Sequence, residues 1–237
     1  MLLAKSKATL KRLIWKMKMN NIEKIIGYHF KDENLLNMAL THSSYAHEHN
    51  MPCYERLEYL GDALVNFIVG EYLYSNFDLP AGQLTKYRAC LVSTESFAKI
   101  IENLGLEQYI LIGKSVQKIS KSLLADIFES LLASIYLDGG KENADKFVQT
   151  KLLKSKENVL NIINLNMDYR TLLQEKLQAA TPQKTMRWVL EKEEKVVNRK
   201  MFTISLYIDG EKIATSTQDT HKKCQQFCSK IVLEKLN

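Results

Sequence analysis

The sequence is poor in cysteine and contains no long apolar run. Its four cysteines, at positions 53, 90, 224 and 228 of 237, show no CxxC or other zinc-ligand spacing. No window approaches the roughly 20 apolar residues that a membrane-spanning helix needs, and no segment resembles a secretory signal. We therefore expect free thiols, no membrane contact and a cytoplasmic location.

Charge of one sign is missing from whole stretches of the chain. Residues 1–20 carry six Lys or Arg and no acid, whereas residues 57–85 and 122–140 carry no Lys or Arg. Net charge is +6 over 1–20, −4 over 21–166 and +4 over 167–237, which gives the total of +6. This distribution suits basic parts that hold a polyanion and an acidic part that holds a cation, although a solvated basic tail is an alternative.

Hydrophobic periodicity divides the chain into two regions, without internal repeats or low-complexity tracts. The first, from about residue 22 to 156, predicts an all-α domain. Its expected helices cover residues 34–40, 55–74, 84–104, 123–137 and 144–153, with breaks at 78–82 and at 138–140. A polar-to-mixed connector follows over 154–166.

The second region has a different order of elements, typical of a small α+β domain. A helix over 169–178 precedes two alternating strands at 186–190 and 201–208. A turn at Asp209-Gly210 leads to a third strand and a closing helix. The predicted order is therefore α-β-β-β-α, with the last two elements over 212–217 and 220–236.

Three acids lie on one stripe of the helix "ERLEYLGDALVNF". Glu55, Glu58 and Asp62 are three, four and seven residues apart, so at about 100° per residue they share one narrow arc. An acidic solvent face is the simplest interpretation. However, no acid has a basic partner three or four residues away, and the repulsion between Glu58 and Asp62 costs about 0.2–0.5 kcal/mol unless a cation lies between them.

A second acidic pair lies in a helix that is otherwise apolar on all sides. In "SLLADIFESLLASIYLD", Asp126 and Glu129 are three residues apart, and such helices are normally buried. Buried carboxylates must be protonated, paired or bound to metal. Together with Glu58 and Asp62 they offer four oxygen donors of the kind that Mg²⁺ prefers. The alternative is two solvated faces that never meet.

The sequence offers no convincing base and nucleophile pair in this region. His42, His47 and His49 cluster in "THSSYAHEHN", but satisfied polar or surface histidines are the better interpretation. Divalent metal catalysis needs no such pair, because a metal ion itself activates water and neutralises developing negative charge.

These motifs closely resemble the ribonuclease III family. The similarity extends through "IGYHFKDENLLNMALTHSSYAHE", "GQLTKYRACLVSTESFA" and "LLADIFESLLASIYLDGG" to a double-stranded-RNA-binding domain near the C-terminus. The resemblance implies hydrolysis of double-stranded RNA with Mg²⁺, or Mn²⁺ as a substitute, leaving 5′-phosphate and 3′-hydroxyl ends in rRNA, mRNA and tRNA processing. It also implies a homodimer.

The resemblance assigns roles to residues and ranges of this chain. It implies metal coordination by Glu58, Asp62, Asp126 and Glu129, with Asp62 and Glu129 most directly tied to catalysis and Glu55 as a supporting acid. It divides the chain into four parts. These are a basic extension over 1–20, an all-α endonuclease domain over 21–153, a linker over 154–166 and the RNA-binding domain over 167–237.

In the last helix, His221, Lys222 and Lys223 lie at the N-terminal end, where the helix dipole also favours phosphate. We expect them to contact RNA, with a solvated lysine cluster as the alternative.

Several positions depart from the family pattern. Asn198 stands where relatives usually have the histidine of a Gly-Pro-x-His loop, which weakens the expectation of RNA binding there. Ala81 and Ser43 replace residues that are commonly acidic and basic, and the loop before Leu123 is short. Residues 1–16 suit a targeting helix, an RNA-binding arm or translation that starts at Met17 or Met19; we favour the last.

Two functions stay open at this stage. The first is an RNA-cleaving enzyme. The second is a catalytically silent relative that binds structured RNA or ribosomal particles. The presence of all four acids favours the enzyme, because a silent protein has no physical reason to retain unpaired carboxylates.

Overall fold

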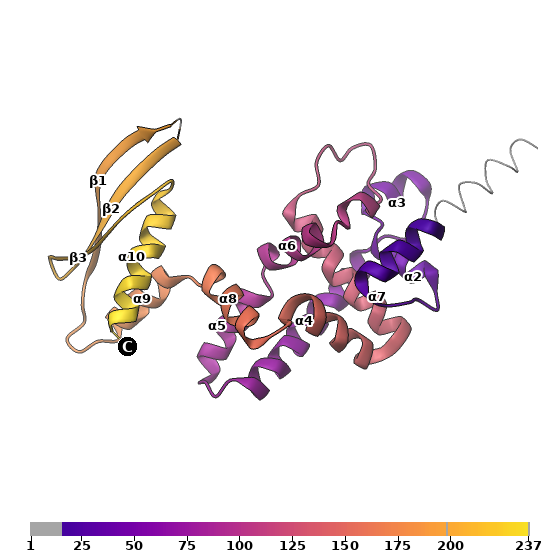
Figure 1. Cartoon of the computed structure of the whole chain (residues 1–237), viewed down its shortest axis with the longest axis horizontal. Coiled ribbons are helices and arrows are strands. Elements are labelled where there is room, and N and C mark those ends of the chain that lie inside the picture. The colour runs from indigo at the N-terminus through magenta and orange to yellow at the C-terminus, as the bar shows by residue number, and fades with distance from the viewer. Residues whose placement is uncertain (1–15, 198, 237) are drawn as a thin grey trace, which may run out of the picture. The chain divides into compact units, whose positions relative to one another are not determined.

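A computed structural model of the chain describes residues 16–197 and 199–236. The chain forms two compact units, and the boundary between them lies between Asn166 and Met167 (Figure 1). Most of the basic extension over 1–20 and Asn198 lie outside the described residues. No helix among the described residues is long and apolar enough to cross a membrane.

Helices build the first unit, as the apolar periodicity predicts. A helix over residues 16–26 comes first. The next helices are α2 Glu33–Ala39, α3 Ser43–His49, α4 Glu55–Asn76, α5 Ala81–Leu91, α6 Thr94–Leu104 and the 3₁₀ turn η1 Glu107–Tyr109. The last are α7 Lys121–Val148, the π-helical turn η2 Gln149–Leu153 and α8 Lys156–Asn166. The all-α prediction is therefore confirmed.

Several helix boundaries differ from those expected. The single helix predicted over 84–104 is two helices, because the Ser93 side chain accepts a hydrogen bond from Ser96 N and caps a new helix there. Helix α3 was not predicted. The break predicted at 138–140 is confirmed, because α7 consists of two helical segments that meet at a kink at Gly140, with φ 79°, and the second segment continues to Val148. Glycine reaches this conformation without the steric cost of a side chain.

The segment expected to be a linker is partly helical and attached to the first unit. Val159 and Ile163 of α8 are buried. The Asn166 amide donates to Cys90 O at 3.0 Å and to Ser96 Oγ at 2.9 Å. The sequence does not indicate this helix clearly, because four asparagines, which favour turns and caps over helix interiors, are interspersed among its apolar residues.

Helices α4 and α7 pack against one another through the centre of the first unit. Val65 and Val69 of α4 are fully buried, as are Phe128 and Leu131 of α7. At Gly61 the two backbones nearly touch, because a Cβ atom placed there would lie 2.0 Å from the carbonyl oxygen of Glu129. Only glycine permits this approach, which brings the acidic residues of the two helices to one place.

The second unit has the predicted α-β-β-β-α order. Its elements are α9 Tyr169–Gln178, β1 Met186–Val196, β2 Arg199–Ile208, β3 Glu211–Gln218 and α10 His221–Lys235. The strands form an antiparallel sheet in the order β1-β2-β3. A core of Leu173, Leu177, Leu206, Cys228 and Val232 joins the two helices to one face of this sheet.

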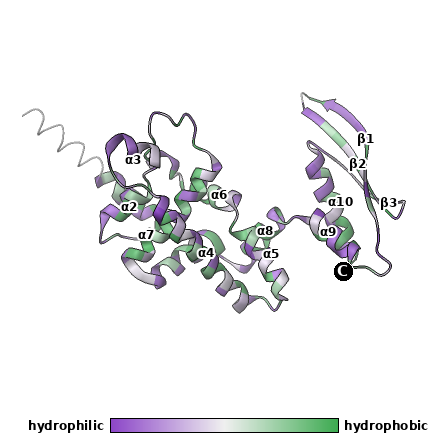
Figure 2. Ribbon diagram, turned by 180° about the vertical axis from the view of Figure 1, so that it is seen from behind, coloured by the Kyte–Doolittle hydropathy of each residue, from purple (hydrophilic) through white to green (hydrophobic). Residues whose placement is uncertain are grey.

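Strand β1 is longer than its hydrophobic pattern indicates. The alternation ends at Leu190, yet pairing with β2 continues to Val196 after an irregularity between Leu190 and Lys192. An ion pair between Lys200 and Glu193, at 2.9 Å, supports the polar end of this hairpin. Figure 2 shows that β2 is hydrophobic in its middle and hydrophilic at its start, next to the turn from β1.

Candidate functional site

The first turns of α4 present the three acids of the predicted stripe. Glu58 is partly buried, whereas Glu55 and Asp62 are exposed. The Asp62 carboxylate accepts a hydrogen bond of 2.9 Å from the side chain of Asn66 on the same helix. The three acids thus lie on one side of α4, with Glu58 turned furthest into the protein.

Helix α7 brings two more acids to the same place. Asp126 and Glu129 are partly buried, and the backbone approach at Gly61 sets them against α4. One carboxylate oxygen from each of Glu58, Asp126 and Glu129 lies within 4.8 Å of the other two. We call these three residues with Asp62 the acidic cluster. Asp62 is not part of the group of three, but its charge acts on Glu129.

The electrostatics of the acidic cluster are unfavourable to negative charge. Burial, followed by the charges of Asp62, Asp126 and Glu58, raises the pKa of Glu129 to about 8. Burial also raises the pKa of Glu58, with further contributions from Asp126, Glu55 and Asp62. None of the four carboxylates forms an ion pair within the part of the chain that the structure describes.

Two neighbouring side chains, those of Tyr54 and His42, oppose this effect at Asp126 by favouring its ionised form. The hydroxyl of Tyr54, which precedes α4, donates to Asp126 Oδ2 at 3.1 Å. Burial raises the pKa of Asp126, whereas this hydrogen bond and the nearby His42 lower it. Tyr54 is buried, and its backbone N–H donates to Thr41 O at 3.0 Å. Tyr54 could not be identified from the sequence, since a tyrosine at a helix start carries no sign of its partner 72 residues away.

The acidic cluster fits a hard divalent cation. Two oxygens bound to one Mg²⁺ lie at most about 4.2 Å apart, because each bond is about 2.1 Å. The oxygens of Glu58, Asp126 and Glu129 lie within 4.8 Å of one another, a limit slightly above that separation. Carboxylates with raised pKa values and no cationic partner have the chemistry of an ion site.

The histidines near α3 are structural or exposed, as expected. The His42 ring nitrogen Nδ1 accepts from Ser44 N at 3.1 Å and caps α3. His49 stacks on Tyr45 with ring centroids 3.9 Å apart, and His47 is exposed. Of these, only His42 lies near the acidic cluster, where it lowers the pKa of Asp126 electrostatically and is not part of a nucleophilic pair.

The predicted RNA-contacting residues lie in the first turn of α10, and their surroundings differ. Lys222 and Lys223 are exposed, but the Lys223 ammonium pairs with Asp219 at 2.7 Å. The His221 ring meets the ring of Phe202 edge-on, with centroids 4.4 Å apart. Lys222 has no ion pair within the described residues, so its charge is the most available of the three.

Each of the two units is similar to a known protein family. The Ribonuclease-III-like family matches residues 32–156, and the double-stranded RNA binding motif matches residues 169–236. Ribonuclease 3 of Limosilactobacillus fermentum is 35% identical over 223 residues, which cover 91% of this chain and 95% of the relative. Ribonuclease 3 of Campylobacter jejuni is 38% identical over 226 residues, with 92% and 99% covered.

A solved structure is similar to the first unit. The nuclease domain of ribonuclease III from Campylobacter jejuni, described as flexible in the region involved in dimer formation, matches with a TM-score of 0.51 and 37% identity. The match covers 62% of this chain and 96% of that domain. With a nuclease unit that carries an acidic cluster and a second unit of the RNA-binding type, this chain belongs to the ribonuclease III family.

Proposed function

We propose that this protein is a divalent-metal-dependent endoribonuclease that hydrolyses double-stranded RNA. One observation carries the proposal. Carboxylates from α4 and α7 converge within 4.8 Å without any cationic partner in the described residues. We infer that hydrolysis leaves 5′-phosphate and 3′-hydroxyl ends, and that Mg²⁺ serves as the cofactor, with Mn²⁺ as a substitute.

Each acid has a distinct part in this proposal. Glu58, Asp126 and Glu129 would hold the ion from inside the cluster, and Asp62 would complete the set from the exposed side. A bound ion supplies Lewis acidity and neutralises charge on the phosphate. We assign the most direct catalytic roles to Asp62 and Glu129, and a supporting role to Glu55 in the first turn of α4.

Two residues, Tyr54 and Gly61, position the carboxylates of the acidic cluster and need not contact RNA themselves. Tyr54 holds one oxygen of Asp126 by hydrogen bonding, and that oxygen cannot rotate away without losing the bond. Gly61 fixes the distance between the two helices. The protein therefore presents the carboxylates in a preformed arrangement, which lowers the cost of binding a cation.

The second unit supplies binding to the duplex. We assign catalysis to residues 21–153 and RNA binding to residues 167–237, with Lys222 as the principal cation of α10 and His221 and Lys223 beside it. A small αβββα domain recognises the shape and phosphates of A-form RNA with little regard to sequence. Long or structured duplexes in rRNA, mRNA and tRNA precursors, in the cytoplasm, are the substrates we propose.

An apolar stripe on α4 supports a homodimer. Tyr59 and Phe67 are 83% and 56% exposed, and Ala63 lies between them on the same face at helical spacing. Exposed apolar stripes of this kind mark interaction surfaces, and the similar Campylobacter nuclease domain is described as having a region involved in dimer formation. A monomeric mass by light scattering would contradict this proposal.

The second candidate is a silent RNA-binding relative. It would need the RNA-binding unit and not the acidic cluster. The raised pKa values of Glu58, Asp126 and Glu129 mark a cluster that is costly without a cation, which favours the enzyme.

Cleavage assays test the enzymatic proposal directly. Wild-type protein should cut a long duplex RNA with Mg²⁺ and not in EDTA. Glu129→Gln should lower the cleavage rate about 100-fold or more, because a loss of roughly 3 kcal/mol of transition-state stabilisation has that effect. RNA affinity should stay within about twofold. Glu142→Gln, an exposed acid of the same helix, should cut normally, and cleavage in EDTA would refute the proposal.

Stability should depend on pH through Glu129. Its pKa is about 8 in the folded chain and about 4.3 in an unfolded one. Between these values the folded chain retains a proton that the unfolded chain has lost, so the free energy of unfolding should fall as pH rises. In EDTA the Tm should decrease from pH 5 to 8, less steeply in Glu129→Gln than in Glu142→Gln.

Mg²⁺ should reverse that loss at the upper end of the range. An ion that takes the place of the proton at 100 times its Kd would stabilise the protein by about 2.7 kcal/mol. The increase in Tm should be largest near pH 8 and absent in Glu129→Gln. An equal increase in Tm in the wild type and in Glu129→Gln would show that the ion binds elsewhere.

Salt dependence of RNA binding tests the role of α10. Each phosphate neutralised adds about 0.9 to the slope of log affinity against log salt for a DNA duplex, taken as a guide for RNA. Lys222→Ala should flatten the slope by nearly one. Lys223→Ala should flatten it less, because Asp219 already neutralises that ammonium. Lys212→Ala, on the sheet face away from α10, should leave the slope unchanged; equal slopes for all three would contradict the assignment.

A further inference from the structure

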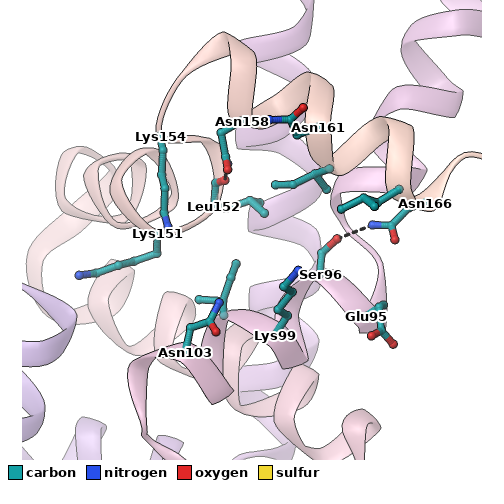
Figure 3. Close-up of a pocket in the computed structure, with 13 residues that line it drawn as sticks. Glu95, Ser96, Lys99, Asn103, Lys151, Leu152, Lys154, Asn158, Asn161 and Asn166 are labelled. Atoms are coloured by element: carbon teal, nitrogen blue, oxygen red, sulfur yellow. Dashed lines mark hydrogen bonds between the residues drawn. The ribbon is translucent and has the colours of Figure 1, made fainter.

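A cavity of about 520 Å³ lies in the first unit, outside the acidic cluster. Its walls come from α6, η2, the residues after η2 and α8, and none of its lining residues belongs to α4 or α7. Figure 3 shows Lys99 and Asn103 on the α6 side and Asn158, Asn161 and Asn166 on the α8 side. The volume suits a small-molecule ligand, since such sites typically measure roughly 300–1,000 Å³.

Positive charge dominates the lining. Three lysines, at positions 99, 151 and 154, contribute to it, against one carboxylate, Glu95, among the described residues. That carboxylate is already occupied, because the Lys121 ammonium lies 2.6 Å and 2.7 Å from its two oxygens. The cavity therefore has an excess of cations for which the described residues provide no counter-charge.

One partly buried lysine of the lining is held in place by a backbone carbonyl. Lys151 Nζ donates to Ile25 O at 2.8 Å, which anchors the ammonium. Burial, followed by the charge of Lys154, lowers the pKa of Lys151. Lys154 follows the π-helical turn with φ 55° and ψ −67°, a conformation that side-chain-bearing residues rarely adopt. An anion near these lysines would relieve the repulsion between them.

The rest of the lining combines apolar surface with free amides. Ile100 and Ile162 face the cavity from α6 and α8. The side chains of Asn103 and Asn161 form no hydrogen bond with any described residue, and amides of this kind can donate and accept at the edge of a heterocycle. Asn158 and Asn166 are instead bound to the protein, through Leu152 O and Ser96 Oγ.

We propose that this cavity is a nucleotide-binding site, in which Lys99 and Lys154 bind phosphate, Ile100 and Ile162 contact the base, and Asn103 and Asn161 hydrogen-bond its edge. The ligand is either a free nucleotide or the 5′-phosphorylated terminal nucleotide of an RNA strand. Both present the same chemistry, a planar base and a terminal phosphate. An occupant would join α6 to α8, the helix that leads into the RNA-binding unit.

Calorimetric titration of the full chain with 5′-AMP in EDTA tests the proposal. EDTA removes metal-mediated phosphate binding at the acidic cluster, so the result is independent of the proposed nuclease activity. We expect a Kd below about 1 mM, and at least about tenfold weaker binding of adenosine, which lacks phosphate. The variant Lys99→Ala/Lys154→Ala should also bind 5′-AMP at least about tenfold more weakly, as loss of charge-assisted hydrogen bonds predicts.

Two further variants make the result specific to the cavity. Asn103→Asp changes one exposed side chain to an acid of equal size and should weaken 5′-AMP binding without lowering the Tm. Lys114→Ala/Lys118→Ala removes the same charge from residues that do not line the cavity and should bind as wild type. Undetectable binding of 5′-AMP, or equal affinities in the two double-lysine variants, would overturn the proposal.

Oligonucleotides distinguish the two sources of ligand. A single-stranded tetranucleotide with a 5′-phosphate that competes with 5′-AMP and binds at least about tenfold more tightly identifies an RNA end. Equal or weaker binding than 5′-AMP identifies a free nucleotide. A tetranucleotide with a 5′-hydroxyl that binds as tightly as its phosphorylated counterpart would contradict recognition of the phosphate.

Discussion

The close approach of two helix backbones at Gly61 is the constraint on which the rest of the first unit depends. A side chain at this position would collide with the carbonyl group of Glu129, so helices α4 and α7 could not lie so near one another. The acids of α4 and those of α7 would then lie apart from one another rather than in one cluster. Packing therefore creates the electrostatic problem that the acidic cluster presents.

That problem has a limited number of physical solutions. Carboxylates this close either share protons, as the raised pKa of Glu129 indicates, or share a cation. The hydrogen bond from Tyr54 orients Asp126 without neutralising it. The proposed cation binding at this cluster and the proposed phosphate binding by the basic second unit would be complementary, because a duplex held by α10 would carry the negative charge that a metal-loaded cluster attracts.

Sequence reasoning succeeded where the signal is local. The α-β-β-β-α order follows from alternation and turn residues, and the missing basic partners of Glu58 and Glu129 pointed to their unusual surroundings. It failed at one distant contact and at two local ones. Nothing near Gly61 indicates that another backbone lies against it. The break at Ser93 depends on a cap that interrupts an otherwise continuous apolar pattern, and the pairing of Lys223 with Asp219 requires the helix start to be known.

Mg²⁺ titration of Gly61→Ala, beside Gly82→Ala, tests whether the close packing of α4 and α7 creates the cation site. A methyl group at residue 82 meets nothing within 4 Å, so that variant should keep the stability and metal affinity of the wild type or gain slightly in helix stability. Gly61→Ala should lose about 1–3 kcal/mol of stability through overpacking. Measured at a temperature where circular dichroism shows it folded, it should bind Mg²⁺ at least about tenfold more weakly. Wild-type stability and Mg²⁺ affinity in Gly61→Ala would contradict the account.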